Sequence, residues 1–135
     1  MYEPIRSKSV HTTVHAEVPH RTRVEELDIR LAGHLTALLT VTDELRALEP
    51  SAELDDAALR LAAHVADRSG GRMPLRAAPS VRSTDPHRSV ALHQRAHTLA
   101  GHAVVVARSL GDEAAAELAA GRADVHASAL GLTAA

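Results

Sequence analysis

Histidine is the residue type whose number and spacing could do chemistry in this chain, with 10 among 135 residues. His93 and His97 stand four residues apart in a segment expected to be helical, so both rings would project from one side of that helix. Two imidazoles at this spacing can bind one metal ion. His93, His97, His34 and His102 are therefore the candidate ligands for a divalent transition metal or a haem.

Three features of the sequence weaken that metal interpretation. His93 and His97 fall on a flank of the expected helix, away from its leucine and valine stripe, which places them on the surface or against a second chain. Arg95 lies between them, and no H-E-x-x-H or E-x-x-H motif accompanies them. His34 occupies a core-type position and is expected to be half-buried. No cofactor is expected, and a metal or haem bundle is the first alternative.

Composition argues against several other classes of site. Cysteine is absent, which removes disulfides, thiolate zinc sites, iron–sulfur clusters and a cysteine nucleophile. Tyr2 is the sole aromatic residue of the Phe, Trp and Tyr set, so no platform exists for stacking bases. The sequence has no phosphate-binding glycine loop, no dinucleotide fingerprint and no nucleophile elbow. A non-enzymatic protein is expected.

Arginine supplies the second set of candidate site residues. Arg72, Arg76, Arg82 and Arg88 gather around a linker rich in glycine and proline, where they could contact phosphates. The whole chain has a formal net charge of −2, unlike the basic balance of a typical DNA-binding domain. A DNA-associated regulator using these four arginines is the second alternative.

Four amphipathic segments must position these side chains. Each has a recognisable start. Thr22 with Glu25 forms a capping box, Ser51 is an N-cap, Asp85 precedes a proline at the first helical position, and Asp112 opens the last helix. Breaks occur at Pro50, at the Gly70–Gly71 pair and at Gly111. The expected helices span about 22–48, 51–68, 86–110 and 112–130.

Short turns between these segments favour an all-α, antiparallel four-helix bundle over residues 22–132, with a flexible linker at 69–84. Residues 1–21 are expected to form an extended N-terminal arm, since polar and apolar residues alternate from Val10 to Val18 as in a strand. This arm is either loose or pairs with the same segment of a second chain.

The many alanines and the glycine of the last expected helix make its pattern of apolar and polar residues weak. Its expected apolar stripe consists of Ala114, Leu118, Gly121, Val125 and Ser128. Glycines inside the expected helices predict close approach of neighbouring backbones, since each costs about 1 kcal/mol relative to alanine. These interior glycines are Gly33, Gly101 and Gly121.

The function expected from these observations is that of a small cytoplasmic helical protein that binds or regulates a protein partner. Self-association as a homodimer is expected, because the predicted core is thin and rich in alanine. No apolar run approaches the length of a membrane span, and the N-terminus does not resemble a secretory signal.

Overall fold

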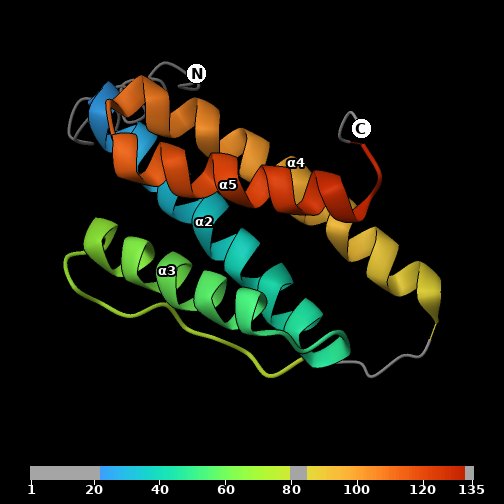
Figure 1. Cartoon of the computed structure of the whole chain (residues 1–135). Helices are drawn as coiled ribbons and strands as arrows, with labels where there is room; N and C mark the ends of the chain where they lie inside the picture. The colour runs from blue at the N-terminus through green and yellow to red at the C-terminus, as the bar shows by residue number, and fades with distance from the viewer. Residues whose placement is uncertain (1–21, 80–84, 133–135) are drawn as a thin grey trace, which may run out of the picture.

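A computed structural model describes residues 22–79 and 85–132, which contain four α-helices and no strand (Figure 1). The helices are α2 (Arg23–Leu48), α3 (Ala52–Arg68), α4 (Pro86–Leu110) and α5 (Glu113–Ala129). The predicted all-α bundle is confirmed, and the helices begin and end close to the predicted residues. The predicted N-terminal arm, residues 1–21, lies outside the described residues.

Helix α2 is the central element of the bundle. It packs against α3 on one side and α4 on the other, while α5 packs on α4 and meets α3 only sparsely. The end of α2 meets the start of α3 through Arg46 and Asp55, and it meets the start of α4 through Glu49 and His93. His93 in turn meets His126 near the end of α5. Neighbouring helices therefore run in opposite directions, as two hairpins (Figure 1).

The predicted helix caps form as expected. Thr22 Oγ1 accepts a hydrogen bond from the Glu25 N–H at 3.1 Å, and the Thr22 N–H donates to the Glu25 carboxylate at 2.9 Å. Ser51 Oγ accepts from the Leu54 N–H at 3.1 Å. These contacts fix where α2 and α3 begin, because they satisfy N–H groups that have no partner inside the helix.

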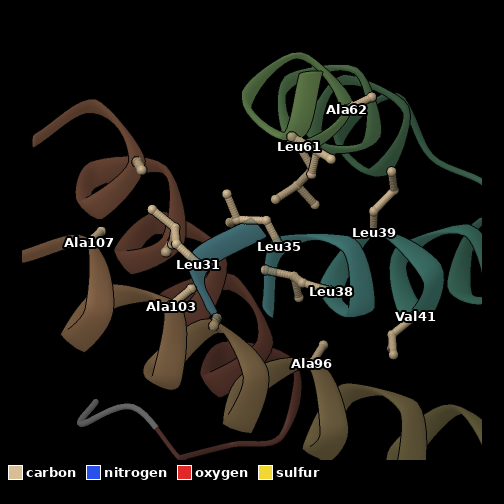
Figure 2. Close-up of a cluster of buried hydrophobic side chains, with 14 of the residues drawn as sticks. Leu31, Leu35, Leu38, Leu39, Val41, Leu61, Ala62, Ala96, Ala103 and Ala107 are labelled. Carbon is tan, nitrogen blue, oxygen red and sulfur yellow. The ribbon is translucent and has the colours of Figure 1, made fainter. Parts of the chain in front are cut away.

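Large and small side chains are divided between the helices of the core. Leucines of α2 point towards both α3 and α4 (Figure 2). Opposite them, α4 presents mostly alanine. The small side chains let α4 lie close to α2, so the leucines fill the space between the helices. The fully buried leucines of α2 are Leu31, Leu35, Leu38, Leu39 and Leu45.

The predicted stripe of α5 is wrong. Leu118 is half-buried, whereas Gly121 and Val125 are exposed. The helix is rotated so that alanines, one arginine and one histidine face the bundle, because alanine allows close packing on α4 and the polar residues find partners there. The buried residues of α5 are Ala115, Ala116, Ala119, Arg122 and His126.

The predicted reason for the interior glycines is also wrong. A Cβ atom added at Gly33, Gly101 or Gly121 would meet no atom within 4 Å, so none of them marks a close approach of helices. Gly111 differs, since it has a φ of 74° at the end of α4 and is required there.

We therefore expect Gly101→Ala to raise the free energy of unfolding by about 0.5–1 kcal/mol, because alanine lowers the backbone entropy of the unfolded chain. Urea unfolding measures this change. Gly111→Ala is the matched comparison and should lower stability by about 1 kcal/mol, since alanine is strained at positive φ. A destabilising Gly101→Ala would contradict the open space seen around this glycine.

Candidate functional site

The structure pairs His93 with His126 of α5, and not with His97. The two Nδ1 atoms lie 2.9 Å apart, and the His93 side chain is only 13% exposed. The expectation that His93 lies outside the bundle is therefore wrong. Helix α4 packs against α2 and α5 at once, so the flank that carries His93 is covered as well as the apolar stripe.

A hydrogen-bonded network extends from this pair to the other helices. On one side, His93 Nε2 lies 3.1 Å from Glu49 Oε1, and Ser89 Oγ bonds to the other carboxylate oxygen. On the other side, His126 Nε2 lies 3.4 Å from Arg122 Nη2. Because Glu49 is the C-cap of α2, this part of the network joins α2, α4 and α5.

Arg122 carries the network to the fourth helix. Its side chain is 5% exposed, and Nη1 bonds to the Glu53 carboxylate in the first turn of α3. Its Nε is buried without a partner among the described residues. Sequence reasoning missed both His126 and Arg122, although their spacing of four residues places them on one side of α5.

Donors and acceptors along the network admit one assignment of the protons. Arg122 can only donate, so His126 Nε2 accepts and His126 Nδ1 carries the hydrogen. His93 Nδ1 must then accept from His126, which leaves His93 Nε2–H to donate to Glu49. Both imidazoles are neutral in this assignment, and an added proton on either would face another donor.

The electrostatics agree with this assignment. Burial and, after it, the charge of Arg122 lower the pKa of His126 from 6.5 to about 4. The hydrogen bond from Ser89 lowers the pKa of Glu49, and His93 acts in the same direction. His126 is fully buried and out of reach of a substrate. The network therefore holds the ends of the helices together.

The four predicted metal ligands do not converge on one centre. His34 of α2 lies beside His102 of α4, with ring centroids 5.4 Å apart, and burial followed by the nearby His102 lowers the pKa of His34. His97 is half-buried on α4. Within residues 22–79 and 85–132, no group of three or more histidine, aspartate or glutamate residues is arranged to hold a metal ion.

The predicted phosphate-contacting arginines are mostly engaged with the protein itself. Arg76 makes two hydrogen bonds to the Asp43 carboxylate, at 3.0 and 2.7 Å. Arg88 lies 3.3 Å from a Glu44 oxygen. Arg72 donates from Nε to the Ser69 carbonyl oxygen, and Arg82 lies outside the described residues.

The Arg76–Asp43 pair anchors an extended segment, residues 72–79, against the bundle. This segment runs back along α3 from the end of that helix (Figure 1). Its backbone makes no hydrogen bond to the backbone of any described residue. Beside it lies a hollow of about 640 Å³, lined by Thr36, Val65, Ser69 and the stretch from Arg72 to Leu75.

The side chains that line this hollow are apolar or bear a hydroxyl group, except for the charged Arg72. Met73 is 65% exposed and Leu75 is 97% exposed, although both border the hollow. On α2, no charged residue occurs between Arg30 and Asp43. Ile29, just before this stretch, lies on the same side of α2 as Gly33, Thr36 and Thr40; Thr36 is half-buried and the other three are exposed. We call these four residues, with Met73 and Leu75, the docking surface.

No family model, no curated protein and no solved structure matches the chain. In the part of the chain that the structure describes, no helix is both long enough and apolar enough to cross a membrane. The function must therefore be inferred from the surface and the network themselves.

Proposed function

We propose that this chain is a small, non-enzymatic binding protein of the cytoplasm that acts through protein–protein interaction at the docking surface. The observation that carries the proposal is the exposure of Met73 and Leu75 on an extended segment that borders a hollow. Single exposed apolar residues are ordinary, but exposed apolar side chains grouped beside a hollow are typical of an interaction site.

The shape of the surface favours an extended partner segment. Residues 72–79 offer backbone groups that the described residues leave without backbone partners, so a partner strand could add to this edge. Side chains of such a strand would contact Met73 and Leu75 on one side and the threonine-rich face of α2 on the other. The partner is a protein with an apolar extended stretch, and a second copy of the chain is one such partner.

Affinity capture from extracts of the source cells tests this proposal. Wild-type protein is compared with Met73→Glu/Leu75→Glu and with the control Leu59→Glu, which changes an apolar residue that is 69% exposed on α3. We expect the wild type and the control to retain the same protein, and the double variant to bind it about tenfold more weakly. Equal retention by all three would refute the docking surface. Sedimentation velocity of the same variants tests self-association.

A further inference from the structure

We propose that the hollow beside residues 72–79 receives an acidic side chain of the partner segment, an aspartate or a glutamate flanked by apolar residues. This inference deepens the proposed function and rests on it, because it names the chemistry of the partner at the docking surface. A positive charge, free hydrogen-bond donors and apolar walls come together in this hollow.

The charge of the hollow comes from Arg72. Among the described residues that line the hollow, Arg72 alone is charged, and no carboxylate lies beside it there. Arg72 is exposed, and its guanidinium stays protonated at any pH of interest. On α2, Asp43 is already bound to Arg76. The hollow therefore holds a positive charge without a partner, which attracts an anionic group.

Arg72 keeps its two outer nitrogens for such a group. Its Nε donates to the Ser69 carbonyl oxygen at 3.2 Å, which ties the side chain to the turn after α3. Nη1 and Nη2 make no hydrogen bond or ion pair to a described residue. Arginine can bind both oxygens of a carboxylate through two parallel hydrogen bonds, so these nitrogens suit an aspartate or a glutamate.

Two hydroxyl groups line the same hollow. Thr36 of α2 and Ser69 after α3 are both half-buried. Thr36 accepts from the Thr40 hydroxyl through its carbonyl oxygen, and Ser69 likewise accepts from Arg72 through its carbonyl oxygen. Neither Oγ is bonded to a described residue. Both hydroxyls can therefore donate to an acceptor in the hollow, in addition to Arg72.

The other walls of the hollow are apolar and limit what can accompany the carboxylate. Val65 comes from α3, and Met73, Pro74 and Leu75 come from the extended segment. The volume of about 640 Å³ falls within the range of about 300–1,000 Å³ that is typical of ligand pockets. A segment with acidic residues alone would leave these apolar walls exposed to water. Apolar residues beside a single acidic residue would cover them.

The extended segment favours a peptide over a free anion. Met73 and Leu75 follow Arg72 closely in the chain, and both are exposed at the border of the hollow. A peptide that brings an acidic side chain to Arg72 carries its apolar neighbours past these two residues. Its backbone can also pair with residues 72–79, whose backbone has no backbone partner among the described residues. A free anion would use Arg72 alone.

Selection from a random peptide library tests this inference. Phage-displayed peptides are first depleted on Met73→Glu/Leu75→Glu, which removes peptides that bind other surfaces, and are then selected on the full-length wild-type chain. We expect the retained peptides to carry an aspartate or a glutamate next to apolar residues. Retained peptides without an acidic residue, or the failure to retain any peptide, would overturn the proposal.

Charge reversal at Arg72 tests the contact itself. Fluorescence anisotropy gives the Kd of a selected peptide for the wild type, Arg72→Glu and the matched control Arg95→Glu, an exposed position on α4. We expect Arg72→Glu alone to weaken binding about tenfold. The same peptide with lysine in place of its acidic residue should bind Arg72→Glu more tightly than the wild type. Equal weakening by both variants, or no gain with the lysine peptide, would contradict the contact.

Failure of this inference and failure of the proposed function are distinguishable. Arg72→Glu is added to the capture experiment beside Met73→Glu/Leu75→Glu. Loss of the partner by the double variant with full retention by Arg72→Glu would keep the docking surface and overturn the acidic partner segment. Full retention by both would refute the docking surface itself. Loss by both, with retention by Arg95→Glu, is the result expected if both proposals hold.

Discussion

Lowering the pH from about 7 to about 4 is expected to reduce the free energy of unfolding by about 3 kcal/mol through His126 alone. The pKa of His126 is about 4 in the folded protein and 6.5 in its ordinary state, so the unfolded chain binds the proton more tightly. The stability that depends on neutral His126 is fully present above pH 6.5 and is lost progressively as the pH falls towards 4. Urea unfolding followed by circular dichroism at several pH values measures the loss.

Replacement of His126 isolates this effect from the carboxylates that also titrate in acid. His126→Gln keeps a donor and an acceptor but cannot take up the proton, so its stability should depend less on pH between 6.5 and 4 than that of the wild type. His87→Gln, at an exposed position in the first turn of α4, should leave the pH dependence unchanged. Parallel curves for the wild type and His126→Gln would show that the buried ring does not control acid stability.

The histidine network also shows where sequence reasoning reaches its limit. The caps and leucine repeats of α2 and α3 were predicted because they depend on residues only three or four positions apart. The His93–His126 contact joins residues 33 positions apart, and no local spacing reveals it. In α5, alanine occupies so many positions that several faces of the helix are equally apolar in sequence. The large side chains of Leu118 and Val125 favoured a face that is not the buried one.

The position of the extended segment against the bundle could not be predicted from local sequence patterns either. The glycines and prolines predicted a linker without helix or strand, and residues 72–79 form neither. They did not predict that Arg76 would bind Asp43. That contact joins residues 33 positions apart and needs the turn at Gly70 and Gly71, both with positive φ, to direct the chain back along α3. One local signal was available: α2 has no charge between Arg30 and Asp43, although part of that stretch faces outward.

Leu35→Ala is expected to lower the free energy of unfolding by about 3 kcal/mol, within the range of 2–5 kcal/mol for truncating a buried leucine. Leu35 is fully buried in the middle of α2, the helix that packs on both α3 and α4 (Figure 2). Its side chain points towards α3, beside Leu61, so the loss includes a cavity between these helices as well as buried apolar area (Figure 2). Urea unfolding at neutral pH measures it.

Leu59→Ala is the matched control, because it removes the same atoms from a side chain that is 69% exposed on α3. Its effect should stay within about 0.5 kcal/mol, as for most surface substitutions. A loss at Leu35 as small as that at Leu59 would mean that α2 is not the centre of the core. The contrast between the two leucines therefore tests whether the large buried side chains of α2 hold the bundle together.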